Sequence, residues 1–331
     1  MNPTLVQFFR CPACRAEVEL WDVREERDGE VVEGTIACQT CGVTYLVQAR
    51  VPILLPPGRR AVDDFATLLA LESQHVGFAE GIRRLADGEI EYPIHDPYGR
   101  PVTPSEASEA RYRETEAFWD TFSRNRLVQQ QMNAIDQHWD AVEEMWLRAE
   151  VNLADSILDV RTAWGGTFHR LLERGPQDAL VVALDTAFLN LKIAHGRCER
   201  EELTHGSFVV GDIAVPPFAP ALFESVVSWF GLGSQPRFHA ALDGVERVLA
   251  PGHAFAAAWT PSMYDDMEGL AGVDVLQRLA ARLDIPLDLD DALRVAEQAG
   301  FEEVEVTPVG PIYVLSGRAP LGGPSPHEQD A

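Results

Sequence analysis

The stretch of sequence that decides the fold is residues 156–185, SILDVRTAWGGTFHRLLERGPQDALVVALD. It begins and ends with apolar runs of strand length, at 156–160 and 179–185, and the pattern at 168–174 between them is helical. Two apolar strands joined by a helix are typical of a βαβ unit, in which the strands run parallel and are buried on both faces. We therefore expect this stretch to belong to a parallel sheet covered by helices.

The same alternation of strand and helix continues toward the C-terminus. The last two predicted strands, 304–309 and 312–317, flank a Gly310–Pro311 turn that is too short for a crossover, so they should be antiparallel. Residues 151–318 are thus predicted to form an α/β domain with a mostly parallel seven-stranded sheet and an antiparallel C-terminal hairpin. Residues 319–331, rich in proline and glycine, are predicted to be a disordered tail. The other expected strands are 207–212, 222–230 and 254–259, and the other expected helices are 187–199, 237–249 and 289–299.

Four of the five cysteines fall in two CxxC pairs, Cys11 with Cys14 and Cys38 with Cys41. Each pair places two thiolates on one tight turn, and four thiolates complete the tetrahedral coordination of a structural Zn²⁺. A unit this small cannot bury enough apolar surface alone, so residues 1–57 should be a small β zinc ribbon that depends on metal for folding. A redox pair and an iron–sulfur site are the alternatives. Short strands are expected at 16–20, 31–37 and 44–55.

Residues 58–150 are predicted to be a helical connector between the ribbon and the α/β domain. The simplest interpretation of its last part is a helix whose apolar face packs on the α/β domain, and the alternative is a helical lid over a ligand cleft. The apolar residues of that face recur at spacings of three and four: Val128, Met132, Ile135, Trp139, Val142 and Trp146.

The composition excludes several classes of protein. Of 331 residues, 46% are hydrophobic, as is ordinary for a globular protein, and no run reaches the roughly 18 apolar residues of a membrane span. The first residues, MNPTLVQFFRCPAC, lack the basic and apolar regions of a secretion signal, so a cytoplasmic location is expected. The formal net charge of −25 repels nucleic-acid phosphate, so unspecific binding to DNA or RNA is not expected.

Small and acidic residues follow the first three predicted strands of the α/β domain. Further along, the residues 247–252, RVLAPG, are expected to lead from a helix into the fifth strand, and 299–301, AGF, to precede the sixth. In this order over residues 157–301, these features resemble the class I S-adenosylmethionine-dependent methyltransferases, of the type 11-like kind. The residues that carry the resemblance near the first three strands are Asp159, Gly165 and Gly166, then Asp185, then Asp212 and Ile213.

The resemblance implies a Rossmann-like methyltransferase fold and an enzyme that uses S-adenosylmethionine. It implies that the turn after the first strand lies beside the methionine part of this cofactor, that Asp185 accepts hydrogen bonds from both ribose hydroxyls, and that Asp212 and Ile213 face the adenine. The sequence departs from the family at Arg161 and Ala163, where the glycine-rich turn has its first two glycines. A side chain there strains the turn or blocks the cofactor, unless Arg161 reaches the cofactor's carboxylate.

Several functional alternatives stay open. The substituted turn also suits a degenerate methyltransferase fold that acts as a non-catalytic binding or scaffolding protein, and a NAD-dependent oxidoreductase is a third interpretation. For the enzyme, the acidic surface favours a small-molecule acceptor over ribosomal RNA. A similar ribbon-plus-methyltransferase layout nevertheless occurs in guanine methyltransferases of ribosomal RNA. The sequence predicts neither a catalytic base nor an oligomeric state.

The residues after the second cysteine pair resemble a second family. Residues 41–45, CGVTY, and 51–56, VPILLP, are similar to the end of the small zinc-ribbon activator proteins. Those proteins dock on methyltransferases that act on tRNA, ribosomal RNA and release factors. The resemblance covers residues 1–55, and it implies that this ribbon serves the methyltransferase domain of its own chain.

Overall fold

The computed structural model describes residues 1–57, 77–87, 135–233, 237–260, 272–283, 286 and 288–322. The N-terminal elements are η1 (Pro3–Phe8), β1 (Glu19–Arg27), β2 (Glu30–Ala37), β3 (Thr44–Gln48) and β4 (Val51–Leu54). They are followed by α2 (Phe78–Asp87) and α5 (Trp139–Arg148), and then by η2 (Val151–Leu153), β5 (Ser156–Val160), α6 (Gly166–Arg174), β6 (Leu180–Asp185), α7 (Phe188–Arg200), β7 (Gly206–Gly211), β8 (Phe223–Trp229), α8 (Phe238–Val248), β9 (Leu249–Trp259), α10 (Val273–Leu283), α11 (Leu289–Gln298), β10 (Glu302–Val309) and β11 (Ile312–Arg318). No helix in these residues is long and apolar enough to cross a membrane.

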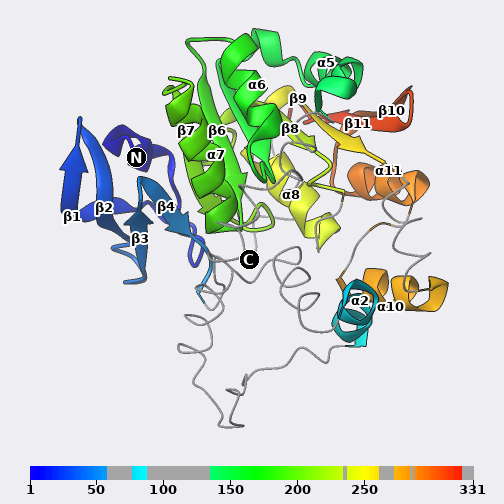
Figure 1. Cartoon of the computed structure of the whole chain (residues 1–331), viewed down its shortest axis with the longest axis horizontal. Coiled ribbons are helices and arrows are strands. Elements are labelled where there is room, and N and C mark those ends of the chain that lie inside the picture. The colour runs from blue at the N-terminus through cyan, green and yellow to red at the C-terminus, as the bar shows by residue number, and fades with distance from the viewer. Residues whose placement is uncertain are drawn as a thin grey trace.

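One sheet runs through the described part of the chain in the order β1-β2-β3-β4-β7-β6-β5-β8-β9-β11-β10 (Figure 1). Strands β5 to β9 pair in parallel, so that Leu158 of β5 lies between Val182 of β6 and Val226 of β8. The last two strands, β10 and β11, form an antiparallel hairpin on β9. The predicted fold class is confirmed, because the seven expected strands of the α/β domain are β5 to β11.

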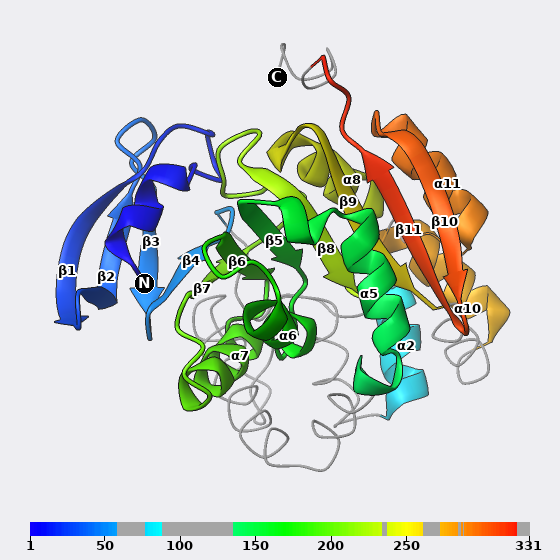
Figure 2. The same cartoon turned by 90° about the horizontal axis from the view of Figure 1, so that it is seen from above.

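Helices cover both faces of the sheet and divide its core in two. Helices α5, α6 and α7 lie on one face, with Phe168 and Leu191 buried beneath them (Figure 2). Helices α8 and α11 lie on the other, where Phe238 and Ala296 are buried. The central strands are therefore apolar on both faces, which is why they read as continuous apolar runs in the sequence.

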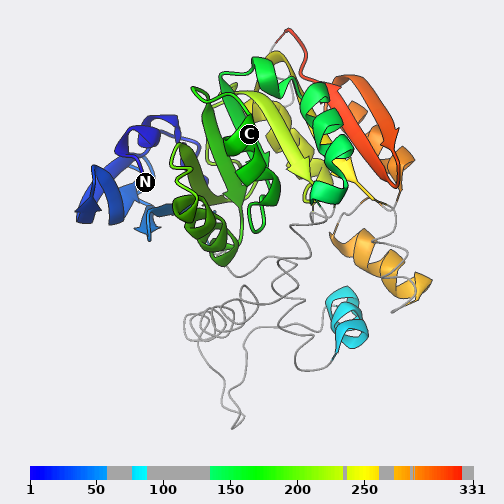
Figure 3. The ribbon, with the colours of Figure 1, turned by 45° about the horizontal axis from the view of Figure 1, so that its top comes forward.

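The N-terminal unit is joined to the α/β domain through the sheet itself. Residues 44–55 were expected to form one strand, but they form two, because Ala49 and Arg50 adopt left-handed φ values of 48° and 66° and turn the chain. The second of these strands, β4, then pairs in parallel with β7, with Ile53 opposite Val210. The ribbon strands thus extend the edge of the domain's sheet (Figure 3).

The first ribbon strand is displaced from its expected position. The expectation was residues 16–20, whereas β1 spans Glu19–Arg27. The hairpin turn at Asp28 and Gly29, with φ of 53° and 77°, lets β1 pair with β2 up to Arg27 opposite Glu30. Most side chains of β1 are exposed and many are charged, so apolar patterning does not mark this strand in the sequence.

The apolar face of α5 packs on the α/β domain, as the simpler interpretation predicted. Val142 and Trp146 are buried, and α5 contacts β9 and β11. Val128 and Met132 lie outside the described residues. At the other end of the domain, the described residues continue past the predicted boundary at 318 as far as 322, and Ala319 is buried and exchanges backbone hydrogen bonds with Gly252 and His253.

Candidate metal centre and cofactor site

The four cysteines of the CxxC pairs meet at one point. All four Sγ atoms lie within 4.8 Å of one another, with 3.6 Å between Cys11 and Cys41 and 3.5 Å between Cys14 and Cys38. A disulfide needs about 2.05 Å between sulfurs. Tetrahedral zinc with Zn–S bonds of about 2.3 Å separates its ligands by about 3.8 Å. The spacing therefore fits a four-thiolate zinc site.

Two similar turns aim these sulfurs inward. The amide of Arg15 donates to the carbonyl of Cys11 at 2.7 Å, and the amide of Gly42 donates to the carbonyl of Cys38 at 2.9 Å. Both turns end in the left-handed region, with φ of 62° at Arg15 and 74° at Gly42. The hydroxyl of Tyr45 lies 3.1 Å from Cys11 Sγ, where it is placed to donate to a thiolate and orient it. Sequence patterning did not single out Tyr45.

A second contact attaches the metal centre to the α/β domain. The backbone just before Cys11 pairs with residues that follow β7, through Arg10 N–H to Pro217 O at 3.0 Å and Ala219 N–H to Phe8 O at 2.8 Å. The rings of Phe9 and Phe218 pack at 6.1 Å between centroids, and both side chains are buried. The ribbon is therefore held at two places, here and at β4.

Three residues predicted to bind the cofactor lie at or near the carboxyl ends of the neighbouring strands β5, β6 and β7. Asp159 lies near the end of β5, Asp185 ends β6, and Asp212 follows β7, and these strands are neighbours in the sheet. Their side chains are 1%, 2% and 0% exposed. Ligands of open α/β sheets bind outside the carboxyl ends of the strands, where the strand order reverses. In this sheet that point lies between β5 and β8.

In the turn between β5 and α6, every second residue from 161 to 165 adopts the left-handed backbone conformation. Arg161, Ala163 and Gly165 have φ of 60°, 50° and 76°. Only Gly165 adopts this conformation freely; a Cβ on it would also lie 2.6 Å from the Cβ of Ala194. A non-glycine residue in the left-handed region costs roughly 1–2 kcal/mol. The turn therefore has the backbone of a glycine-rich turn and carries strain at two of three positions.

Replacing Ala163 by glycine is expected to stabilise the folded chain by up to about 1 kcal/mol. The substitution relieves left-handed strain, and the greater freedom of glycine in the unfolded chain offsets part of the gain. Chemical denaturation measures the free energy of unfolding. Ala141→Gly, in the interior of α5, is the control and should lower it by about 1 kcal/mol. Equal losses in both variants would contradict the strain at Ala163.

Asp185, at the end of β6, holds the turn that follows β5 in place through hydrogen bonds. Its Oδ2 accepts from the amide of Ala163 at 2.9 Å, and its Oδ1 accepts from the amide of Ala187 at 2.9 Å and from Asn190 Nδ2 at 3.4 Å. The backbone amide of Arg161 also donates to the carbonyl of Leu184 at 2.7 Å. The predicted ribose ligand thus has a structural role in this edge of the sheet.

Asp159 is also buried, but unlike Asp185 neither of its carboxylate oxygens has a hydrogen-bond partner among the described residues. The nearby hydroxyl of Thr162 donates instead to the Asp159 backbone carbonyl at 2.9 Å. Burial raises the pKa of Asp159 to about 8; the nearby hydroxyls of Thr162 and Thr167 oppose the rise, and the negative charge of Asp185 adds to it. A buried carboxyl group without partners marks a place where a polar ligand group would be stabilising.

This pKa predicts a pH dependence of stability. Between the ordinary carboxyl range near pH 4 and about pH 8, the folded chain binds the Asp159 proton and the unfolded chain does not. The contribution of Asp159 to the free energy of unfolding therefore falls as the pH rises through this window. Asp159→Asn should flatten the decline measured by chemical denaturation at pH 5.5 and pH 8. The exposed Asp178→Asn is the control, and an unchanged slope in both variants would contradict the buried proton.

The side chains of Asp212 and Ile213 are less accessible to a ligand than the resemblance implies, because both are buried. The Asp212 carboxylate pairs with the guanidinium of Arg237 and accepts from the amide of Ala214 at 3.0 Å. The Ile213 side chain is buried in the core on the α8 face. Its carbonyl oxygen would lie 1.7 Å from a Cβ on Gly244, so α8 packs directly on this segment. Arg237 had no role in the sequence interpretation, because it comes to Asp212 only in the folded chain.

The comparison with protein families bears on this arrangement of strands, turn and acidic residues. Residues 157–252 match the family described as "Methyltransferase domain". The matched methyltransferase domain begins in β5 and ends in β9, so it contains the left-handed turn, Asp159, Asp185 and Asp212.

Two curated relatives match the same part of the chain. The ubiquinone/menaquinone biosynthesis C-methyltransferase UbiE of Rhizobium leguminosarum bv. trifolii is 32% identical over 97 residues, which are 29% of this chain and 38% of that protein. The demethylmenaquinone methyltransferase of Thermus thermophilus is 36% identical over 112 residues, 32% of this chain and 50% of that protein. The chain thus matches half or less of the length of each of these relatives.

Solved structures similar to this chain include two of interest. The first is phosphoethanolamine N-methyltransferase 2 of Haemonchus contortus in complex with S-adenosyl-L-methionine. It is 13% identical to this chain with a TM-score of 0.44, and the match covers 55% of this chain and 53% of the Haemonchus chain. The second is the complex between the Haloferax volcanii Trm112 methyltransferase activator and a methyltransferase. Its matching chain is 16% identical to this chain with a TM-score of 0.43, and the match covers 61% of this chain and 97% of the matching chain.

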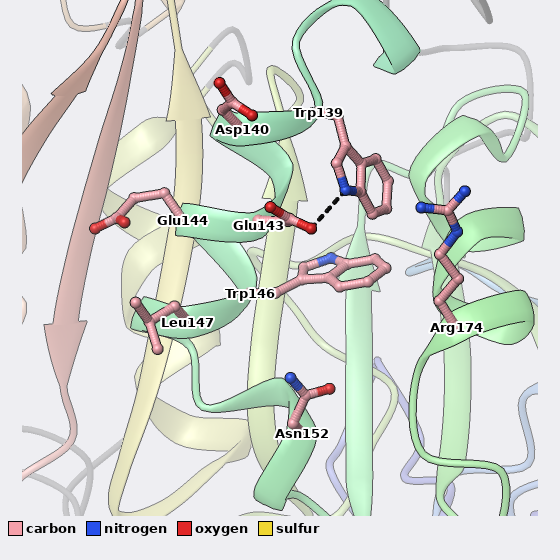
Figure 4. A pocket seen from close by; sticks show the side chains of 8 residues that line it. All are labelled: Trp139, Asp140, Glu143, Glu144, Trp146, Leu147, Asn152 and Arg174. Carbon is pink, nitrogen blue, oxygen red and sulfur yellow. Dashed lines mark hydrogen bonds between the residues drawn. The ribbon is translucent and has the colours of Figure 1, made fainter.

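A surface pocket of about 580 Å³ lies away from the methyltransferase domain's turn (Figure 4). It is formed by α5, η2 and the end of α6, and η2 precedes the amino end of β5. Arg174 lies 4.4 Å from the centre of the Trp139 ring, whose Nε1 donates to Glu143 at 2.7 Å. None of the predicted cofactor residues lines it. The lining residues are Trp139, Asp140, Glu143, Glu144, Trp146, Leu147, Asn152 and Arg174.

Proposed function

We propose that this chain is an S-adenosylmethionine-dependent methyltransferase that acts on a small-molecule acceptor. The observation that supports the proposal most is the match of residues 157–252 to a methyltransferase domain, since the match contains the left-handed turn and the acidic strand ends. Both curated relatives are methyltransferases by name. When bound, the cofactor would supply a methyl group on a sulfonium sulfur: an acceptor nucleophile bonds to the methyl carbon in line with the carbon–sulfur bond, which breaks and releases S-adenosylhomocysteine.

The residues at the carboxyl ends of the strands fit this cofactor. The unpartnered carboxylate of Asp159 suits the ammonium group of the methionine part, which would also favour its ionised form. Gly165 and Gly166 open α6 with backbone that a ligand is able to approach closely. Asp185 already accepts three hydrogen bonds, and a carboxylate has about four acceptor sites. We therefore expect Asp185 to take one ribose hydroxyl rather than two.

The adenine side of the proposed site is built more from backbone than from side chains. Asp212 and Ile213 would border the base, with the Asp212 carboxylate kept in place by Arg237. The paired, fully buried carboxylate has less capacity to bind the base directly than the sequence resemblance implied. Its proposed contribution is to hold the backbone after β7 in position.

A small molecule is the proposed acceptor because of charge. A chain with a formal net charge of −25 repels a polyanionic RNA at long range, whereas the encounter with a neutral small molecule is unaffected. The named relatives act in quinone biosynthesis, but they match only the shared domain.

Calorimetric titration of the full zinc-loaded chain with S-adenosylmethionine and S-adenosylhomocysteine tests the cofactor. Binding of both in the micromolar range is expected, and absence of heat at millimolar concentration would support a non-catalytic scaffold instead. A parallel titration with NAD should give no heat. For the acceptor, release of S-adenosylhomocysteine is measured with a panel of small quinols, phenols and amines and with ribosomal RNA. Turnover with RNA alone would contradict the small-molecule assignment.

A further inference from the structure

The side chain of Arg161 lies across the place where the proposed cofactor would bind. Arg161 directly follows β5, and β5 lies between β6 and β8 in the sheet. On the β8 side, a Cβ on Gly231 would lie 2.2 Å from the Cβ of Arg161, so the arginine stem packs closely on Gly231. On the β6 side, its Nη1 donates to Thr186 Oγ1 at 2.8 Å. The side chain thus crosses the carboxyl end of β5.

This position is the point at which the strand order reverses. Strands β6 and β7 continue the sheet on one side of β5, and β8 and β9 continue it on the other. Open α/β sheets bind their ligands in the crevice at such a point. Arg161 is half-buried there, and it occupies the left-handed conformation that a glycine would adopt more easily. The neighbouring loop accommodates it with a glycine at 231, where any side chain would clash.

The charges around the crevice indicate what such a side chain would bind. Asp159 lies next to the last residue of β5 and Asp185 ends β6, and both carboxyl groups are buried. An arginine remains charged at any physiological pH, and its planar fork of N–H donors matches a carboxylate in two parallel hydrogen bonds. In a ligand that carries both groups, the ammonium would favour the ionised form of Asp159, and the carboxylate would pair with the guanidinium of Arg161.

We propose that Arg161 is the residue that binds the carboxylate of the cofactor's amino-acid part, and that it sets the preference of this site for ligands that carry one. The inference rests on the proposed function, because it assumes that S-adenosylmethionine is the ligand. In this chain a cationic side chain replaces part of the binding that backbone amides of a glycine-rich turn supply. Arg161 is a positioning residue and takes no part in bond breaking.

The test compares two probes that differ in the group concerned. S-adenosylhomocysteine carries the amino-acid part, and 5′-methylthioadenosine has a methyl group in its place. For Arg161→Ala, the dissociation constant for S-adenosylhomocysteine should rise about 10- to 100-fold, as expected for a lost charge-assisted hydrogen bond. The constant for methylthioadenosine should stay within about twofold. Arg161→Lys should recover part of the loss, and Arg174→Ala, on the far end of α6, should change neither.

The remaining outcomes contradict the inference in distinguishable ways. Tighter binding of S-adenosylhomocysteine by Arg161→Gly would mean that the side chain obstructs the crevice. Equal losses for both probes, with a lowered melting temperature, would mean that Arg161 only supports the fold of the turn. If the unsubstituted chain bound methylthioadenosine but not S-adenosylhomocysteine, the carboxylate contact would be wrong. Binding of neither probe would overturn the proposed function itself, and this inference with it.

Discussion

Asp185→Ala is expected to weaken the binding of S-adenosylhomocysteine at least about 100-fold. The substitution removes the proposed ribose contact and also the acceptor that holds the amides of Ala163 and Ala187. The amide of Ala187 would be left buried without this acceptor, at a cost of about 1–3 kcal/mol, and the part-buried amide of Ala163 would lose its acceptor as well. The turn before α6 would then lose both its ligand and its internal support. Calorimetric titration measures the binding, and thermal denaturation measures the loss of stability.

Two further variants separate binding from folding. Asp178→Ala removes an exposed carboxylate just before β6 and should leave both measurements unchanged. Asp185→Asn keeps the shape of the side chain but has one acceptor oxygen fewer, so it should bind more weakly than the unsubstituted chain while folding better than Asp185→Ala. Full affinity in Asp185→Ala would mean that the ribose is held elsewhere.

Removal of the metal should unfold the N-terminal unit and expose the edge of the methyltransferase domain. Metal analysis is expected to give one zinc per chain, and Cys38→Ser or strong chelation should release it. Structural zinc contributes an apparent 10–16 kcal/mol in small zinc-binding units. Because β4 pairs with β7 and Phe9 packs on Phe218, loss of the ribbon uncovers β7. Amide hydrogen exchange should therefore quicken in residues 1–57 and along β7, while β9 stays protected.

The fifth cysteine provides the matched control. Cys198 is buried in α7, away from the metal centre, and burial raises the pKa of its thiol to about 11. Cys198→Ser removes one thiol from the chain and should leave the zinc content at one. Retention of zinc by Cys38→Ser would contradict four-thiolate ligation. Unchanged exchange along β7 after zinc loss would contradict the structural coupling of the two units.

The sequence predicted most elements of the α/β domain to within one or two residues. Helix α7, for example, was expected at 187–199 and spans Phe188–Arg200. This accuracy follows from strong apolar periodicity in elements that are buried along one face or both. In the ribbon it held for β2, expected at 31–37 and found at Glu30–Ala37. It was lost at β1, whose exposed and charged residues carry no such pattern, and at the turn of Ala49 and Arg50, which lacks the glycine or asparagine that usually marks a turn.

The candidate site was predictable in its positions but only partly in its contacts. Chain order and strand ends placed Asp159, Asp185 and Asp212 at one edge of the sheet, and in the structure they lie at or next to the carboxyl ends of β5, β6 and β7; their role toward a cofactor stays a prediction. Their differences come from partners distant in sequence: Asp212 meets Arg237, Asp185 holds the turn, and Asp159 has no partner in the described residues. Spacing alone does not distinguish these three environments.

What the sequence determined by itself is therefore local: the βαβ pattern of residues 156–185, the antiparallel hairpin at the end, and two cysteine pairs that each place two sulfurs on one turn. These features follow from side-chain periodicity and from the short reach of a CxxC turn. Only the tertiary structure decided that β4 joins β7 and that Arg161 crosses the end of β5 between Gly231 and Thr186. The physical reason is that both depend on contacts between segments far apart in the chain, whose approach is set by packing of the whole sheet.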